Sequence, residues 1–210
     1  MTGSESPRRS HLRLVRDASL AEMDDEDLML LHRDGREGAF DVLVIRYRGP
    51  IFGYLRRMGL NAARAEEVAA DVFLKVHRAA PRYERTAKFT TYLYTVAHRA
   101  GLNTRQRHAT RFEIATDTGS FERASSDQGP EHALALKRSF EALQTELDAL
   151  PEEHRAAFVL YYAQGLSCAE VAATLDITTA EAKGRLAYAR KLLRQRLTGR
   201  VPEATPPETT

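Results

Sequence analysis

The chain has 210 residues, of which 43% are hydrophobic and 29% charged, as is typical of a soluble globular protein with one or two small domains. No stretch approaches the roughly 18 uninterrupted apolar residues of a membrane span, and the N-terminus lacks the apolar stretch of a signal peptide. The single cysteine, Cys168, excludes an intramolecular disulfide, so we expect a cytoplasmic protein without membrane insertion.

The net charge of +2 conceals two basic blocks. Residues 82–111 hold seven Arg and Lys residues and one acid, and residues 178–200 repeat that balance. Between them, residues 112–131 hold five acids and one arginine. Two basic blocks separated by an acidic connector predict two contacts with one polyanion.

The chain begins with a polar segment, residues 1–21, that has no periodicity and is expected to be a disordered tail. The acids at positions 24–27 then precede an apolar cluster, as expected at a helix N-terminus. Residues 40–58 place apolar side chains at helical spacing, and Gly49-Pro50 should kink or locally rearrange this helix.

Asn61 is a good N-cap for a third helix over residues 62–80. Its apolar stripe should be buried, and its opposite side forms one line at helical spacing. On most helices such a line is an ordinary solvated face. Its members are Glu67, Asp71, Leu74 and Arg78.

A loop over residues 81–89 is dense in charges and aromatic rings, and a fourth helix is expected over residues 90–107. Tyr92, Arg99 and Asn103 lie along one side of that helix. Interleaved basic and aromatic residues suit unpaired nucleic acid, because rings stack on bases while Arg and Lys follow the backbone. Partly buried tyrosines beside a solvated basic rim are the alternative interpretation.

Residues 109–130 are rich in Ser, Thr, Asp and Gly and predict a flexible linker. A helix over 131–149 should follow, and Pro151 should occupy the first position of another. The Pro- and Thr-rich residues 199–210 are expected to be disordered. Strand-like alternation is absent, so we predict an all-α protein of two small helical domains, residues 22–108 and 131–198.

The last helical stretch, residues 167–197, has the pattern of a helix-turn-helix. Ser167 with Glu170 and Thr178 with Glu181 form two capping boxes, so a helix should begin after each hydroxyl residue. Asp176 lies between them and tolerates the left-handed conformation of a turn. The second helix is strongly basic, which predicts that it lies against phosphates; the alternative is a helical hairpin with a solvated basic face.

These segments together resemble a bacterial RNA polymerase sigma factor of the extracytoplasmic-function (ECF) type. Four stretches carry the resemblance, cover most of residues 38–107 and 150–197, and occur in the order of the family. They are AFDVLVIRYRGPIFGYLRRMG, AEEVAADVFLKVHRAAPRY, FTTYLYTVAHRAGLNTRQR, and LPEEHRAAFVLYYAQGLSCAEVAATLDITTAEAKGRLAYARKLLRQRL.

The resemblance implies two functional regions. Region 2, within residues 22–108, would bind the clamp helices of the β′ subunit of the polymerase core and capture melted bases of the promoter minus-ten element. Region 4, within residues 131–198, would bind the β flap and read the minus-thirty-five element in the major groove. The implied partners are the RNA polymerase core, promoter DNA and an anti-sigma factor.

The same resemblance assigns residues to each role. Core binding is assigned to Glu67, Asp71, Leu74 and Arg78. Minus-ten single-strand binding is assigned to Arg85, Lys88, Phe89, Tyr92, Arg99, Asn103 and Arg107. Minus-thirty-five duplex binding is assigned to Thr178, Thr179, Glu181, Lys183, Arg185, Arg190 and Arg194, of which Arg190 and Arg194 would hold phosphates.

Gly184 departs from the family pattern, in which serine is usual. Glycine inside a helix costs about 1 kcal/mol relative to alanine. We therefore expect this position to permit a close approach to something outside the helix.

Three other functions have to be weighed. A helix-turn-helix regulator that binds duplex DNA without core polymerase explains residues 150–197 but gives the basic-aromatic helix no role. An enzyme is not indicated, because the seven histidines lack metal-ligand spacing and no phosphate loop or nucleophile motif occurs. We accordingly expect no catalytic residue, metal or cofactor. A protein-interaction module would bind DNA without salt dependence, if at all.

Overall fold

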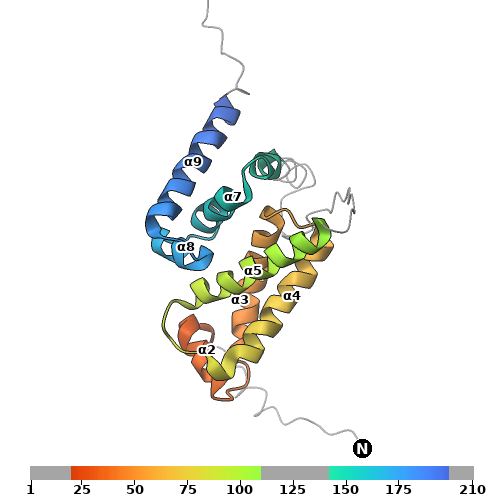
Figure 1. The fold of residues 1–210 in the computed structure, drawn as a ribbon. Coiled ribbons are helices and arrows are strands. Elements are labelled where there is room, and N and C mark those ends of the chain that lie inside the picture. The colour runs from red at the N-terminus through yellow and green to blue at the C-terminus, as the bar shows by residue number, and fades with distance from the viewer. Residues whose placement is uncertain (1–19, 110–141, 199–210) are drawn as a thin grey trace, which may run out of the picture.

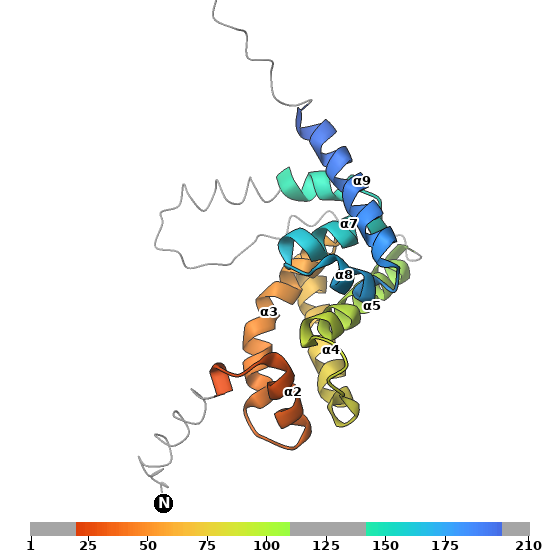
Figure 2. The same cartoon turned by 90° about the vertical axis from the view of Figure 1, so that its left-hand side faces the viewer.

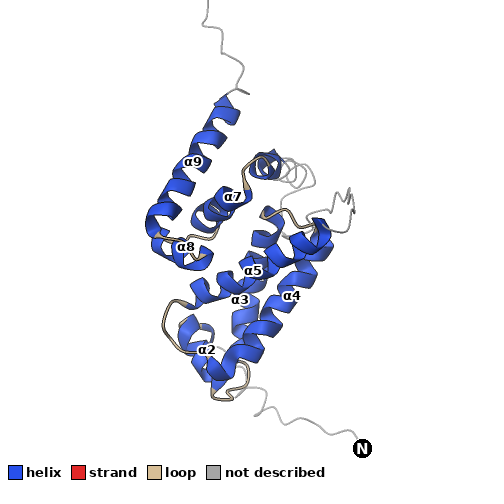
Figure 3. Ribbon diagram, viewed as in Figure 1, coloured by secondary structure: helices blue, strands red, loops and turns tan. Residues whose placement is uncertain are grey.

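The structure is a computed structural model that describes residues 20–109 and 142–198. Every regular element in these two ranges is helical, as the sequence predicts (Figure 3). The N-terminal tail up to residue 19, the predicted linker beyond residue 109 and the C-terminal tail lie outside the described residues. Neither described range contains a helix long and apolar enough to cross a membrane.

The first described range folds into one group of helices (Figure 1). They are α2 (Asp25–Arg33), α3 (Ala39–Arg57), α4 (Ala62–Ala79), the 3₁₀ turn η1 (Ala80–Arg82) and α5 (Phe89–Ala109). As predicted, Asn61 is the N-cap of α4, and its side chain accepts a hydrogen bond from the Arg64 backbone N–H at 2.9 Å. Its predicted apolar stripe, including Val68, Val72 and Val76, is buried.

The helix α3 continues across Gly49 and Pro50 as one helix, with Pro50 in its interior, where the sequence predicts a kink or a local rearrangement. Proline removes one helical hydrogen bond and crowds the preceding turn. The turn that follows contains Ile51, Tyr54 and Leu55, all fully buried, so tertiary packing offsets the local penalty.

The second described range contains α7 (Glu152–Phe158), the π-helical turn η2 (Val159–Ala163), α8 (Cys168–Leu175) and α9 (Thr179–Thr198). A helical segment over residues 142–148 precedes them, and the remainder of the helix predicted over 131–149 lies outside the described residues. Pro151 is the N-cap of α7 and not its first residue, one position from the prediction. The π turn was not predicted by any sequence pattern.

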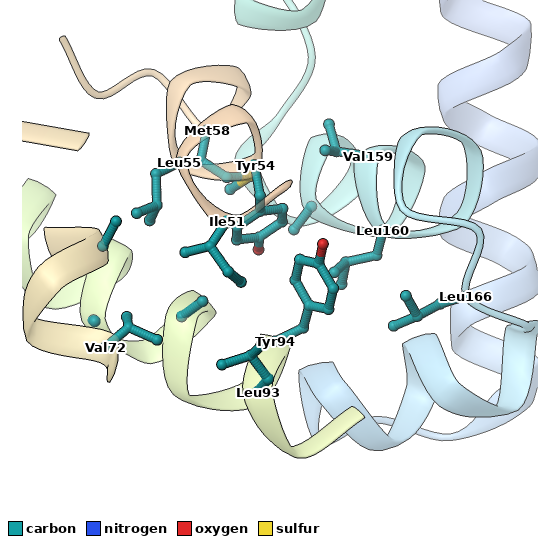
Figure 4. Packing of buried hydrophobic residues seen from close by; sticks show 14 of the residues in the cluster. Ile51, Tyr54, Leu55, Met58, Val72, Leu93, Tyr94, Val159, Leu160 and Leu166 are labelled. Carbon is teal, nitrogen blue, oxygen red and sulfur yellow. The ribbon is translucent and has the colours of Figure 1, made fainter. Parts of the chain in front are cut away.

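The two groups of helices pack against each other. In two views at right angles, α5 lies beside α8, and these helices are in direct contact (Figures 1 and 2). Figure 4 shows Tyr54 and Tyr94 from the first group facing Val159, Leu160 and Leu166 from the second. All five side chains belong to one buried hydrophobic cluster, so apolar burial holds the groups together.

Candidate nucleic-acid and polymerase interface

The predicted helix-turn-helix is confirmed as α8, a turn and α9. The Ser167 hydroxyl accepts the Glu170 N–H at 3.3 Å, and the Glu170 carboxylate accepts the Ser167 N–H at 2.7 Å. The same reciprocal pair joins Thr178 and Glu181, at 3.2 and 2.7 Å. Asp176 ends α8 in the left-handed conformation with φ of 57°. The start of each helix is therefore fixed by its own side chains.

One side of α9 is buried and the other is exposed. Ala182, Leu186 and Ala189 face the protein interior, where α9 packs against α7 and α8. The exposed side carries four of the residues predicted to contact duplex DNA. These are Thr179, Lys183, Arg190 and Arg194.

The other three predicted duplex contacts are Thr178, Glu181 and Arg185, whose partners are as follows. Thr178 and Glu181 are exposed but cap each other, which lowers the pKa of Glu181 through hydrogen bonds from the backbone and side chain of Thr178. The Arg185 side chain is only 23% exposed and forms an ion pair with Glu153 of α7 at 2.9 Å. Of these three, Arg185 would have to leave its carboxylate to reach a base.

The surface predicted to bind single-stranded DNA consists of the loop over residues 83–88 and one side of α5. Arg85 and Lys88 are exposed in the loop, and Lys88 is 71% exposed. Tyr92 is half-buried on the first turns of α5, where its ring lies 5.7 Å from that of Tyr83. Farther along α5, the helix presents the exposed side chains of Arg99, Asn103 and Arg107.

Phe89 differs from the other members of this set because its side chain is fully buried. Its ring makes edge contacts with Tyr47 and Tyr83, at centroid distances of 5.7 and 6.4 Å. The ring is therefore unavailable for stacking on a base in this conformation. It anchors the end of the loop in the core.

The line of residues predicted to bind the core polymerase lies on the exposed side of α4, opposite the buried stripe. Glu67, Asp71 and Arg78 are exposed polar side chains, and Leu74 is 50% exposed. Ile45 on the neighbouring helix α3 is 79% exposed. It lies outside the apolar stripe that helical spacing assigns to the buried side of α3.

Polar contacts join α5 and its preceding loop to the second helical group. The Lys88 ammonium group pairs with Glu170 of α8 at 2.8 Å. Tyr94 of α5 donates a hydrogen bond from its hydroxyl to Gln164. The hydrogen bond from Lys88, together with the backbone bond from Ser167, lowers the pKa of Glu170 to about 2. The first helical group and the second are thus in contact through polar and charged groups as well as through the apolar cluster.

His98 lies within the same contact, on the side of α5 that faces the second helical group. Its Nδ1 is 2.8 Å from the Tyr54 hydroxyl. Burial, and then the positive charges of Arg185 and Arg99, lower the pKa of His98 to about 4. The imidazole is consequently neutral at physiological pH and adds no charge to the basic surface.

The described residues contain no candidate metal-binding site, because no three His, Cys, Asp or Glu side chains lie close enough together there to hold an ion. The arrangement supplies exposed cations and the half-buried ring of Tyr92. Such groups bind phosphates and bases.

The fold and the two basic surfaces thus define a helical DNA-binding protein with a helix-turn-helix in its second part. Two family models match the chain: Sigma-70 region 2 over residues 43–111, and Sigma-70, region 4 over residues 140–193. These spans contain most of the residues that carry the resemblance in the sequence.

Relatives match over most of the chain. RNA polymerase sigma factor CarQ of Myxococcus xanthus is 32% identical over 167 residues, which cover 79% of this chain and 92% of CarQ. The ECF RNA polymerase sigma factor SigE of Mycolicibacterium smegmatis is 28% identical over 195 residues, 90% of this chain and 75% of SigE. The solved structure of CnrH with the cytosolic domain of CnrY has the same fold, with a TM-score of 0.66, 22% identity, and coverage of 84% of this chain and 98% of CnrH. The chain belongs to the RNA polymerase sigma factors of the ECF type.

Proposed function

We propose that this chain is an alternative sigma factor that binds the RNA polymerase core, directs it to specific promoters and initiates transcription. One observation carries the proposal: a single chain presents two unlike basic surfaces, one on a helix-turn-helix and one on a helix that carries the half-buried ring of Tyr92. A duplex-binding regulator needs only the first surface. Promoter opening needs both, because one element is read as duplex and the other as a single strand.

Core binding is proposed for the exposed side of α4, at Glu67, Asp71, Leu74 and Arg78. A half-exposed leucine among charged side chains is the composition of a protein interface, where an apolar anchor is ringed by polar groups. The curated relatives are named as RNA polymerase sigma factors, which supports the polymerase as the partner. The clamp helices of β′ and the flap of β are the proposed contacts for regions 2 and 4.

Minus-ten capture is proposed for the loop and α5. Arg85, Lys88, Arg99 and Arg107 would follow the backbone of the non-template strand, while Tyr92 and Asn103 would contact bases. Phe89 is proposed to hold the loop rather than to touch DNA, because its ring is buried. Since the surface binds the unstacked strand better than the duplex, binding favours the melted promoter.

Minus-thirty-five recognition is proposed for the N-terminal half of α9. Thr178, Thr179, Glu181, Lys183 and Arg185 lie nearest the helix start, which is the part that reaches base edges in a helix-turn-helix. Arg190 and Arg194 would hold phosphates and set the register.

An anti-sigma protein is a further proposed partner. The solved structures of similar fold include CnrH with the cytosolic domain of CnrY and RpoE of Bartonella quintana with the anti-sigma factor NepR, the latter at a TM-score of 0.61 and 17% identity. We propose a cytoplasmic, non-enzymatic protein whose domains span residues 22–108 and 131–198, joined by a flexible linker over 109–130.

The first test is co-elution of the purified chain with RNA polymerase core that lacks sigma, followed by run-off transcription on genomic fragments. A stable complex that initiates at discrete sites is expected. Failure to associate, with protein of helical circular dichroism, would refute the proposal and favour a regulator that acts without core.

The second test separates recognition from core binding. Lys183→Ala should weaken binding to the upstream element by about tenfold, since a good base contact contributes about 1–3 kcal/mol. Lys191→Ala, which removes the same charge farther along α9, is the matched control and should have a smaller effect that does not depend on sequence. Loss of core association in Lys183→Ala would refute the assignment.

A further inference from the structure

The helix α2 holds the loop over residues 83–88 at both ends. At the start of the loop, Arg33 donates from Nη1 to the Tyr83 carbonyl oxygen at 3.4 Å. At its end, the Phe89 backbone N–H donates to Glu26 Oε1 at 2.6 Å. Between these points, Arg85 forms an ion pair with Asp27 at 2.8 Å. Tyr83 and Phe89 are both buried, so the loop is tied to the core at the same two positions.

The contact from Glu26 solves a local problem at the start of α5. The first N–H groups of a helix have no partner inside the helix and are normally satisfied by the side chain of the preceding residue. Here that residue is Lys88, whose carbonyl accepts the first helical bond from the Tyr92 N–H at 3.3 Å. A lysine side chain has donors and no acceptor, so it cannot cap the helix. Glu26, 63 residues earlier in the chain, supplies the missing carboxylate.

The charge of Glu26 adds to the hydrogen bond. A carboxylate at a helix N-terminus interacts favourably with the partial positive charge of the unpaired N–H groups. The Arg85–Asp27 pair contributes less, because both side chains are exposed and exposed ion pairs stabilise weakly. Glu26 is therefore the contact from α2 that fixes where α5 begins.

We infer that Glu26 is a positioning residue for minus-ten capture. It sets the start of α5 and with it the places of Lys88 and Tyr92, which stand on either side of the capped N–H. The inference rests on the proposed function, in which these two side chains contact the captured strand. A loop already held in its binding conformation binds more tightly, because the apparent dissociation constant rises as the competent fraction falls.

The energy of the helix cap determines how much Glu26→Ala should weaken binding of the single strand. Loss of a helix cap typically destabilises the capped conformation by about 1 kcal/mol, which is about fivefold in an equilibrium constant. Glu26→Ala should accordingly weaken single-strand binding by up to about fivefold. Glu26→Gln keeps the length and one acceptor oxygen and should recover most of that loss. Asp24→Ala is the matched control, an exposed acid two residues earlier whose side chain makes no cap bond.

The experiment uses the full chain bound to core polymerase. The probe is a fluorescent oligonucleotide carrying the non-template minus-ten strand of a promoter mapped in the run-off assay, and its dissociation constant is measured for the wild type and the three variants. Hydrogen exchange at the Phe89 amide is measured alongside. We expect faster exchange and binding that is weaker by up to about fivefold in Glu26→Ala, with core association and upstream duplex binding unchanged.

Two results would overturn the inference. One is wild-type binding of the strand by Glu26→Ala despite faster exchange at Phe89. The other is an equal loss of strand binding, core association and upstream binding, which would mark Glu26 as a general structural residue. If the wild-type complex itself does not bind the strand, the proposed function fails, and that outcome is distinct from either result.

Discussion

Gly184 offers a substitution that should make the protein more stable and less able to recognise a promoter. It lies inside α9, on the exposed side, and is not among the glycines with positive φ. No heavy atom lies within 4 Å of the place where a Cβ would be. No intramolecular contact therefore requires a glycine here.

The stability change follows from helix propensity. Gly184→Ala should raise the free energy of unfolding by about 1 kcal/mol, because alanine loses less backbone entropy and has open space for its methyl group. For a protein of this size that corresponds to a rise in melting temperature of about 2–4 °C. Gly101→Ala is the contrasting control, since its Cβ would lie 3.1 Å from Leu55 Cδ2 inside the core. Gly101→Ala should not raise the free energy of unfolding, because crowding in the core opposes the gain in helix propensity.

The promoter effect should have the opposite sign. The added methyl group would project from the same part of α9 as Lys183 and keep the helix backbone away from a base edge. Binding of the polymerase complex to a duplex carrying the upstream element should weaken, while binding to the minus-ten strand stays unchanged. Thermal melting measures the change in stability, and fluorescence anisotropy measures the change in binding to the upstream element. A more stable variant with unaltered upstream binding would show that Gly184 has no role in close approach, and a less stable variant would contradict the propensity argument.

Three further predictions concern the other surfaces. Reversing charge with Glu67→Lys and Asp71→Lys should impair co-elution with core polymerase while leaving upstream DNA binding intact, because these exposed side chains support no internal packing. Glu170 has its pKa lowered to about 2, so its charged form stabilises the fold above about pH 4.5, and this contribution is lost as pH falls toward 2. The stability difference between wild type and Glu170→Gln should therefore narrow across that window in urea titrations. Tyr94→Phe removes the hydrogen bond to Gln164 and should lower the free energy of unfolding by about 1 kcal/mol, with faster hydrogen exchange in α5; unchanged exchange would show that the bond does not hold the two helical groups together.

The elements that were predicted well are those specified by neighbouring residues. The caps at Asn61, Ser167 and Thr178 depend on side chains that bond to backbone within three positions, so their signal is local. The turn at Asp176 depends on one residue that tolerates the left-handed conformation. The buried stripe of α4 is likewise a repeat within one helix. Periodicity alone assigned Glu67 to the outward side.

The parts that were not predicted depend on contacts between distant segments. The sequence shows Lys88 and Glu170 as charged residues but gives no reason to pair them. The same holds for Arg185, whose ion pair with Glu153 requires α7 to lie beside α9. Residue type and period therefore identified the candidate surfaces, but not which of their charges are engaged internally.

The contact between α5 and α8 joins two parts of one chain, so it is insensitive to protein concentration. Dilution cannot separate the strand-binding loop from the helix-turn-helix. A molecule that binds more tightly to the separated state can do so. Any two such molecules share the cost of separation, and each then strengthens the binding of the other by the same factor. A polymerase that draws the two helical groups apart would raise the affinity of α5 for the promoter strand, and the promoter strand would raise the affinity of the chain for the polymerase.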